Sequence, residues 1–456
     1  MQNINPDIFK AYDIRGVYPD QIDGEFAYRL GGAFCRFLIN NGEAGNRKII
    51  MARDTRLSSD ELAENLIQGI TDQSFDVADL GLASAPLFYW AIIKEKAAGG
   101  LMVTASHNPA QYNGFKVCRA DSRMVSGETG LFQIRDLMEQ AGLETSFNAG
   151  KISQVDLKKE YLDFMLSFIK SSQRKPLKIV YDCANGTMGQ EIEEISKLIP
   201  GEKEILFADP DGNFPNHEPN PIKPENMSAL KNKIIESGAD LGIAFDGDGD
   251  RIVFYDEKGE MVRGDFITAL MAEILLKQNP GKKILYEVRS SRVVNEIIRQ
   301  NGGIPVLGKS GHSLIKEHMR RENIFFGGEM SGHYFFQELG YIDSSLLVAI
   351  KILELLSRED KKLSRLVAPL KKYSSSGELN FEVADPDGVL MAAESHFKGA
   401  KGAQVKKIDG LTIEFADWWF NLRKSNTEPL VRLNMEADSP EILEEKRKEL
   451  EGLICG

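Results

Sequence analysis

The sequence is poor in the residues that cross-link a chain or anchor it in a membrane. Its four cysteines (35, 118, 183 and 455) show no C-x-x-C spacing. This argues against a zinc site and a disulfide framework, and predicts free thiols in a reducing compartment. No run of 18 apolar residues occurs, and the N-terminus lacks the basic-then-apolar pattern of a signal peptide. We therefore expect a soluble, cytoplasmic protein with no membrane partner.

Basic residues are outnumbered by acidic ones. The 456 residues include 56 Lys and Arg against 68 Asp and Glu, which gives a net charge of −12. Because nucleic-acid binding needs a basic surface, this balance argues against nucleic acid as a partner. It leaves room for a small anionic substrate, since a local cluster of Arg and Lys can override the overall sign. Apolar residues at 42% and charged residues at 27% are typical of a globular protein and exclude a disordered or collagen-like chain.

Strand-like and helix-like segments alternate over most of the chain. This pattern predicts α/β domains with sheets flanked by helices. At roughly 150 residues per domain, the length predicts about three domains and allows four. After a polar break at 371–377, four strand patterns and a charged helix predict a small α+β domain. The predicted domains are 1–150, 151–251, 252–368 and 369–456.

The first candidate functional segment is Thr104–Pro109 (TASHNP), which begins at the end of the apolar strand pattern at 99–106. It is expected at the carboxyl end of a strand, where α/β sheets place ligands. Ser106 there could be a nucleophile, although a polar turn ended by Asn-Pro is the simpler interpretation of this segment alone. The absence of G-x-S-x-G disfavours an acyl-transfer hydrolase.

The second segment is Asp246–Arg251 (DGDGDR), in which carboxylates recur at every second residue. Asp246, Asp248 and Asp250 can turn toward one point, and such a cluster of oxygen ligands suits Mg²⁺ or Ca²⁺. An EF-hand is disfavoured because Arg251 stands at the sixth position, where that loop needs glycine, and because strand patterns flank the segment. The G-x-G-x-x-G dinucleotide pattern also fails, since the sixth position is Ile252.

Two further segments have the composition of sugar-phosphate contacts. Gly328–His333 (GEMSGH) follows an apolar strand pattern, and Glu329 and Ser331 are suited to bind vicinal sugar hydroxyls. Arg423–Pro429 (RKSNTEP), with Arg432 beyond it, is a donor-rich loop of the kind that holds a phosphate dianion. Taken singly, each segment also reads as an ordinary polar turn.

The four segments together resemble the α-D-phosphohexomutase family, in particular the bacterial phosphomannomutase/phosphoglucomutase type. The resemblance covers essentially the whole chain and includes FKAYDIRG (9–16), ARDTR (52–56), DCANG (182–186), PDGNFPNHEPNP (210–221) and KSGHSLIK (309–316). It implies three related α/β domains with mixed sheets and a C-terminal, TATA-binding-protein-like domain around a central cleft. It also implies reversible interconversion of hexose 1-phosphate and hexose 6-phosphate, with mannose, glucose or both as the sugar.

The resemblance also implies roles for individual residues and cofactors. Ser106 would carry a phosphoryl group, and Mg²⁺, one per active site, would be held by the three aspartates and a phosphoserine oxygen. Glucose 1,6-bisphosphate or mannose 1,6-bisphosphate would act as activator. The expected partners are sugar phosphates, and the expected state is a monomer or weak homodimer. The implied catalytic residues are Ser106, His107, Lys116, Arg15, His312 and Arg251, with Lys116 and His312 as candidates for acid–base work. The implied substrate-binding residues are Tyr12, Arg251, Lys309, Gly311, His312, Glu329, Ser331, Arg423, Ser425, Asn426, Thr427 and Arg432.

Three alternatives stay open at this point. The chain could be a phosphoglucosamine mutase or another sugar-phosphate mutase of the same family, although Met330 favours the hexose-phosphate branch. It could be a Mg²⁺- or Ca²⁺-dependent sugar-phosphate-binding protein, but that function has no use for Ser106. It could be a phosphatase, in which water intercepts the phosphoserine.

Overall fold

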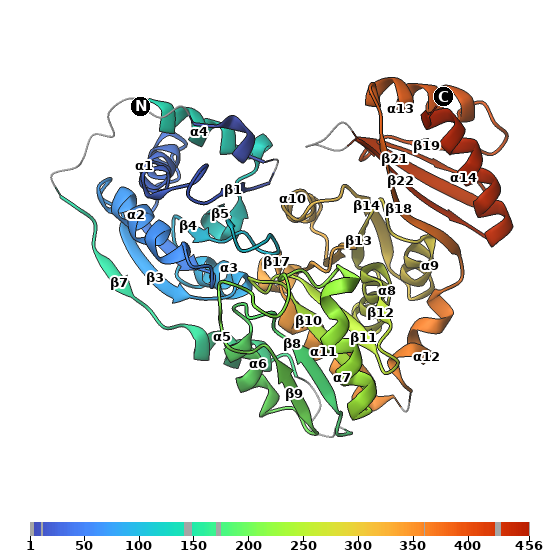
Figure 1. The fold of residues 1–456 in the computed structure, drawn as a ribbon, viewed down its shortest axis with the longest axis horizontal. Helices are drawn as coiled ribbons and strands as arrows, with labels where there is room; N and C mark the ends of the chain where they lie inside the picture. The colour runs from blue at the N-terminus through green and yellow to red at the C-terminus, as the bar shows by residue number, and fades with distance from the viewer. Residues whose placement is uncertain are drawn as a thin grey trace. The chain divides into compact units, whose positions relative to one another are not determined.

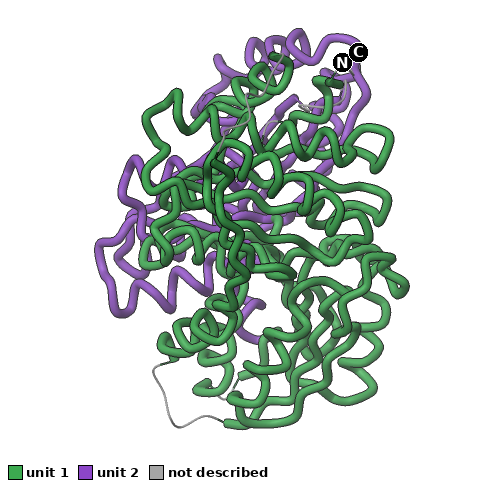
Figure 2. The backbone as a smooth tube through the Cα atoms, turned by 90° about the vertical axis from the view of Figure 1, so that its left-hand side faces the viewer, with its two compact units in different colours: residues 1–263, 331–364 green, residues 264–330, 365–456 purple. Residues whose placement is uncertain are grey.

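The structure is a computed structural model that describes residues 4–10, 12–140, 148–169, 175–359, 361–424 and 430–455. The chain divides into two compact units, coloured separately in Figure 2. Unit 1 comprises residues 1–263 and 331–364, and unit 2 comprises residues 264–330 and 365–456. No helix among the described residues combines the length and the apolar character needed to span a bilayer.

The N-terminal part of unit 1 contains a seven-stranded mixed sheet, coloured blue to cyan in Figure 1. Its order is β1-β5-β4-β2-β3-β7, with β6 paired to β5. Strands β4, β2 and β3 run parallel, whereas β5 returns antiparallel to β4. The strands are β1 (Ile14–Val17), β2 (Lys48–Arg53), β3 (Asp76–Leu82), β4 (Gly99–Val103), β5 (Tyr112–Arg119), β6 (Arg123–Met124) and β7 (Ile152–Gln154). The helices are α1 (Gly24–Asn40), α2 (Ser59–Thr71), α3 (Ala85–Lys94), α4 (Leu131–Glu139) and α5 (Lys158–Leu166).

A second, five-stranded mixed sheet follows in unit 1, in the order β12-β11-β10-β8-β9. Strand β10 pairs parallel with β8 and antiparallel with β11. The predicted boundary between residues 251 and 252 falls inside the β10–β11 hairpin, and the sheet continues to Val262. The elements are β8 (Ile179–Asp182), α6 (Gly189–Ser196), β9 (Lys203–Leu206), α7 (Ser228–Ser237), β10 (Leu241–Phe245), β11 (Ile252–Asp256) and β12 (Met261–Val262).

Unit 2 begins with parallel strands in the order β14-β13-β15. Their elements are α8 (Gly264–Leu276), β13 (Lys283–Glu287), α9 (Arg292–Gln300), β14 (Ile304–Gly308), α10 (His312–Glu322) and β15 (Phe326–Gly328). The chain then returns to unit 1 for the antiparallel strands β16 (Tyr334–Phe336) and β17 (Ile342–Asp343) and for helix α11 (Ser345–Arg358).

The C-terminal part of unit 2 is an antiparallel sheet in the order β18-β22-β21-β20-β19. Its apolar residues pack with the two helices into a core of their own. A short helix, α12 (Leu363–Val367), precedes the sheet. The elements are β18 (Ser374–Glu382), α13 (Pro386–Phe397), β19 (Gln404–Lys406), β20 (Leu411–Glu414), β21 (Trp418–Lys424), β22 (Leu430–Ala437) and α14 (Pro440–Cys455). The predicted fold class, α/β domains with mixed sheets followed by an α+β domain, is therefore confirmed.

One buried carboxyl in unit 1 makes the stability of the fold depend on pH. Glu191 on α6 is 1% exposed, and burial raises its pKa to about 7, although hydrogen bonds from Ser84 oppose the shift. A carboxyl whose pKa is raised on folding stabilises the fold below its ordinary pKa of 4.5, and this contribution is lost as the pH rises through 7.

Glu191→Gln should therefore stabilise the protein at pH 8 by up to about 3 kcal/mol and change little at pH 5. Urea unfolding of both proteins at the two pH values measures this difference. Glu193→Gln on the exposed face of the same helix is the matched control and should show no such pH dependence. A gain of equal size at both pH values would contradict the role of the Glu191 charge.

Candidate active site

Ser106 lies in the loop that connects β4 to β5, directly after a fully buried strand. Its backbone has a φ of 49°, in the left-handed region that non-glycine residues adopt only when their surroundings hold them there. Thr104 Oγ1 accepts a hydrogen bond from the Ser106 amide at 2.8 Å. Ser106 Oγ in turn donates to Asp246 Oδ2 at 2.6 Å, so the predicted nucleophile points at the predicted metal ligands.

The three aspartates lie on the turn between β10 and β11 and are at most 1% exposed. Carboxylate oxygens of Asp246, Asp248 and Asp250 lie within 4.8 Å of one another. Backbone carbonyls of this turn accept hydrogen bonds from three distant segments. Thr187 N donates to Gly247 O at 3.0 Å, Ala85 N to Asp248 O at 2.8 Å, and Ser345 Oγ to Gly249 O at 2.6 Å. The turn is therefore fixed by the beginnings of α3 and α11 and by the segment before α6.

Glycine at position 247 is required by the contact between the two loops. A Cβ atom at this position would lie 2.6 Å from the Ser106 carbonyl oxygen, closer than real Cβ contacts allow. The backbone of the aspartate turn thus packs directly on the backbone of the serine loop. This contact explains the glycine between Asp246 and Asp248.

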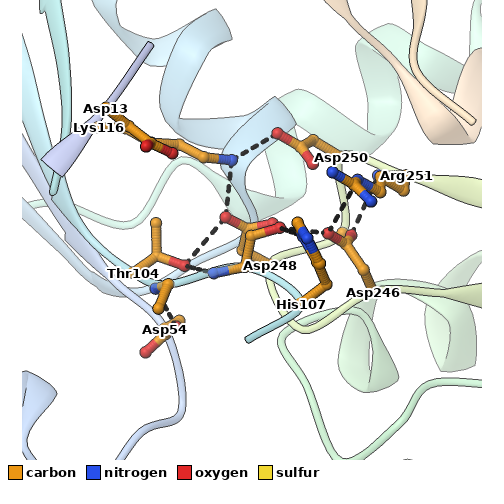
Figure 3. A network of polar contacts seen from close by, with 12 residues as sticks. Asp13, Asp54, Thr104, His107, Lys116, Asp246, Asp248, Asp250 and Arg251 are labelled. Carbon is orange, nitrogen blue, oxygen red and sulfur yellow. Dashed lines mark hydrogen bonds and ion pairs between the residues drawn. The ribbon is translucent and has the colours of Figure 1, made fainter. Parts of the chain in front are cut away.

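Lys116 on β5 supplies a positive charge to the aspartates (Figure 3). Its ammonium lies 2.7 Å from Asp248 Oδ2 and 2.5 Å from Asp250 Oδ2, and the side chain is 2% exposed. Thr104 Oγ1 donates to Asp248 Oδ2 at 3.0 Å. Burial and the neighbouring Asp250 charge raise the pKa of Asp248 to about 7 in spite of the ion pair with Lys116. One lysine therefore does not fully compensate three crowded carboxylates.

The donor set fits a hard divalent cation. Asp248 Oδ1 is buried and has no hydrogen-bond partner among the described residues. Three carboxylates with the Ser106 hydroxyl beside them form an all-oxygen site of the kind that Mg²⁺ prefers. The acidic group is compatible with Mg²⁺ binding.

Three further predicted residues surround the serine. His107 Nδ1 lies 3.1 Å from Ser106 Oγ. Burial lowers the pKa of His107 well below its ordinary value, and the charges of Arg251 and Arg15 lower it further. Arg251 Nε lies 4.0 Å from Asp246 Oδ2, and Arg15 Nη1 donates to Ala105 O at 2.6 Å. Unit 1 thus brings together Ser106, His107, Lys116, Arg15, Arg251 and the three aspartates.

His333 is a site residue that the sequence did not assign. It lies just before β16, with Nε2 3.2 Å from Asp250 Oδ1 and Nδ1 3.0 Å from Ser331 Oγ. The side chain is buried, so the imidazole is held between the aspartate turn and Ser331. The one sequence feature that pointed to His333 was its position two residues after Ser331, at the end of the GEMSGH segment. Tyr12, which precedes β1, is half-buried.

Glu329, Gly311, Lys309 and His312, which are predicted to bind the substrate, lie in unit 2, whereas Ser331 belongs to unit 1. Glu329 Oε1 accepts a hydrogen bond from the Gly311 amide at 3.2 Å and lies 3.4 Å from Arg289 Nη2. Arg289 also pairs with Glu287 at 2.8 Å. Lys309 is exposed and His312 is half-buried at the start of α10.

The predicted phosphate-binding residues also lie in unit 2. Arg423 Nη2 donates to Glu378 Oε2 at 2.5 Å, and Arg432 Nη1 lies 3.7 Å from Glu378 Oε1. Glu378 thus pairs with both arginines. Three predicted members of this loop lie outside the described residues; they are Ser425, Asn426 and Thr427.

Comparison with known proteins places the chain in one family. The domains of phosphoglucomutase/phosphomannomutase match in order: alpha/beta/alpha domains I, II and III at residues 6–144, 159–259 and 263–373, and the C-terminal domain at residues 378–453. A Xanthomonas campestris pv. campestris protein described as "Phosphohexose mutases" is 40% identical over 454 residues, which are 98% of this chain and 99% of that protein. A Vibrio cholerae phosphomannomutase is 39% identical and covers 98% of each chain.

A solved structure agrees with these sequence matches. The crystal structure of a phosphoglucomutase/phosphomannomutase family protein from Burkholderia thailandensis superimposes with a TM-score of 0.90 at 34% identity. The match covers 99% of this chain and 97% of that chain. With the four domains in order and relatives of this identity over nearly the whole length, the chain belongs to the phosphoglucomutase/phosphomannomutase family.

Proposed function

We propose that this enzyme interconverts the 1-phosphates and 6-phosphates of glucose and mannose through a phosphoserine at Ser106. The observation that carries the proposal is the 2.6 Å hydrogen bond from Ser106 Oγ to Asp246 within the buried triple-aspartate group. A serine with only a structural role could donate this hydrogen bond, but it would not compensate the charge of three buried carboxylates. A serine that carries a phosphoryl group uses both the carboxylates and the cation that they can bind.

The proposed reaction has two balanced phosphoryl transfers. In the first, O6 of a hexose 1-phosphate attacks the phosphoserine and loses its proton to a base, while the bond from phosphorus to Ser106 Oγ breaks and Oγ takes up a proton. The product is a hexose 1,6-bisphosphate. After it turns around, Ser106 Oγ loses its proton and attacks the phosphorus on O1, the bond from phosphorus to O1 breaks, and O1 takes up a proton, which leaves hexose 6-phosphate and the phosphoserine. A free hexose 1,6-bisphosphate can phosphorylate Ser106 in the same way, which makes it the activator.

Positioning and charge compensation are the main requirements of phosphoryl transfer. Asp246, Asp248, Asp250 and an oxygen of Ser106 would hold Mg²⁺, which when bound supplies compensation of the negative charge on the transferring group. Arg15 contacts the carbonyl of Ala105, so its guanidinium lies beside the serine loop. Lys116 and His312 remain the candidates for acid–base work, and His333 joins them because it contacts Asp250.

The sugar specificity follows from which hydroxyls are bound. Glucose and mannose differ only at C2, and Glu329 and Ser331 are suited to bind O3 and O4, which the two sugars share. A site that does not bind the distinguishing hydroxyl discriminates only on the order of 10–200-fold. We therefore expect kcat/KM for glucose 1-phosphate and mannose 1-phosphate to lie within about two orders of magnitude.

Galactose 1-phosphate, inverted at C4, should be much the poorest of the three substrates. Glu329→Ala should lower kcat/KM for glucose and mannose phosphates by similar factors, whereas Glu317→Ala on the exposed face of α10 should change neither. Exclusion of glucose or mannose phosphate by four orders of magnitude would show that O2 is bound by other residues.

The direct test of the proposed function incubates the enzyme with glucose 1-phosphate, Mg²⁺ and a trace of glucose 1,6-bisphosphate. Formation of glucose 6-phosphate without free phosphate supports a mutase. Release of free phosphate would instead indicate a phosphatase, and binding without either product would indicate a sugar-phosphate-binding protein. The same assay with glucosamine 1-phosphate separates the hexose-phosphate branch from the phosphoglucosamine branch.

Arg423 provides a test of the two orientations of the intermediate. If one fixed site holds whichever phosphate is not reacting, Arg423→Ala should weaken binding of glucose 1-phosphate and glucose 6-phosphate alike, by roughly 1.5–3 kcal/mol each. Equilibrium titration of the dephosphorylated enzyme measures both values separately. Lys448→Ala, which removes an exposed charge on α14, is the control. Weakened binding of only one of the two phosphates would argue against a shared site.

A further inference from the structure

The guanidinium of Arg56 is fully buried and forms hydrogen bonds with all five of its N–H groups. Nη2 donates to Ser106 O at 3.0 Å and to Asn108 O at 2.6 Å. Nη1 donates to Pro109 O at 2.6 Å and to Tyr112 O at 2.9 Å, and Nε to Asp54 Oδ2 at 3.0 Å. The side chain is 0% exposed. One arginine thus binds four carbonyl oxygens along the loop that carries Ser106.

The serine loop needs an external support of this kind. Ser106 adopts a left-handed backbone conformation, which is unfavourable when the residue is not glycine. A carbonyl at 106 that is held in place fixes the plane of the peptide that follows the serine, and so restricts where Cβ and Oγ can point. The planar guanidinium has five donors in a fixed fork, and a lysine ammonium cannot reproduce that arrangement.

A neighbouring segment of unit 1 covers the same guanidinium. The Phe214 ring lies 5.1 Å from Arg56 Cζ, in cation–π contact. Just before it, Gly212 approaches so closely that an added Cβ would lie 2.3 Å from Thr55 O. Asp54 completes the support, since its Oδ1 accepts from Arg56 N at 3.0 Å and from Ser59 Oγ at 2.7 Å. Asp54 and Phe214 thus hold the guanidinium of Arg56 in place, and the guanidinium in turn holds the serine loop.

We propose that Arg56 is a positioning residue for phosphoryl transfer: its guanidinium fixes the backbone of the Ser106 loop so that Oγ points at the aspartate turn. This inference rests on the proposed function, in which Ser106 carries the phosphoryl group. All five N–H groups of the Arg56 guanidinium donate to the protein, so the guanidinium has no free donor for a substrate. It acts on the rate through Ser106 and leaves binding of the sugar phosphate unchanged.

The experiment compares wild type, Arg56→Lys and Arg56→Ala, with Arg53→Ala as the matched control. Arg53 lies three residues earlier, and its guanidinium pairs with the exposed Asp60. For both Arg56 variants we expect kcat and the rate of Ser106 phosphorylation by glucose 1,6-bisphosphate, followed by mass spectrometry, to fall about 100-fold. We expect the Kd of glucose 1-phosphate to stay within about threefold. Arg53→Ala should match wild type.

Chemical rescue distinguishes positioning from a general loss of structure. Guanidinium chloride at low millimolar concentration should raise kcat of Arg56→Ala about tenfold or more, whereas methylammonium chloride, which brings charge without the planar fork, should not. If Arg56→Ala does not fold, Phe214→Leu, which removes the covering ring, should lower kcat severalfold with Kd unchanged.

Three results would overturn the role of Arg56 alone. The first is that folded Arg56 variants phosphorylate Ser106 at the wild-type rate, and the second is a loss that appears equally in kcat and in binding. The third is equal rescue by methylammonium, since charge would then suffice. A wild-type enzyme that never phosphorylates Ser106 would overturn the proposed function and this role with it.

Discussion

Ser106→Ala should abolish mutase activity while the protein stays folded. Removal of a nucleophile that forms a covalent intermediate typically lowers kcat by roughly 10⁴-fold or more. The substitution removes only the hydroxyl. The backbone of the loop is still held by the hydrogen bond from the Ser106 amide to Thr104 Oγ1 and by Arg56, so the loop itself should persist. Wild-type protein should carry a phosphoryl mass increment on the peptide that contains Ser106, and the variant should carry none. A coupled assay for glucose 6-phosphate measures the loss of activity.

Ser126→Ala is the matched control for this substitution. Ser126 is a buried serine of the same α/β domain that caps a short turn and pairs with Thr129. This variant should keep both its turnover and the phosphorylated peptide. Near wild-type turnover of folded Ser106→Ala would rule out the covalent mechanism, and a phosphoryl group found on another residue would move the nucleophile elsewhere.

Removal of the divalent cation should have a comparably large effect. EDTA should reduce turnover to background and added Mg²⁺ should restore it, because three carboxylates that Lys116 compensates only in part repel the phosphoryl group on Ser106. Asp248→Asn should weaken Mg²⁺ binding, since it removes one of three formal charges from a hard-cation site. Isothermal titration of the chelated protein measures this affinity directly.

A thermal readout makes the metal prediction independent of activity. Because a ligand that binds only the folded state stabilises it by mass action, Mg²⁺ should raise the melting temperature of wild type more than that of Asp248→Asn. Asp163→Asn removes a surface carboxylate on α5 and should behave as wild type in both measurements. Full activity of rigorously chelated enzyme would show that the aspartate turn does not hold a cation that catalysis requires.

Much of the fold could be predicted because its strands are apolar runs bounded by turn residues. The run at 240–246 became β10 (Leu241–Phe245), and the run at 99–106 ended earlier, at Val103, because the polar Thr104–Pro109 segment forms the loop. The aspartate spacing was also informative, because the glycines between the three carboxylates predict the turn that brings them together. Lys116, named only through the family resemblance, lies on β5, two strand positions beyond Gly114.

The roles of the remaining site residues could not be predicted from the sequence, because they arise from contacts between positions far apart in the chain. His333 meets Asp250 across 83 positions, and Arg56 reaches the Ser106 carbonyl across 50. Arg56 and Glu378 carry charges that look like ordinary surface groups until their partners are known. Arg56 stands out in the sequence only as the end of the ARDTR stretch (52–56) of the family resemblance, and no sequence pattern marks Glu378.

The hydrogen bonds that hold the aspartate turn should determine when the enzyme becomes active during its synthesis. The turn is fixed by donors at positions 85, 187 and 345, so its final shape depends on segments that leave the ribosome at widely different times. A nascent chain that ends before residue 345 lacks the hydroxyl that holds Gly249, even though all three aspartates have been made. Competence to bind the cation should therefore appear late in synthesis, and a truncated chain should remain inactive although its first two sheets have formed.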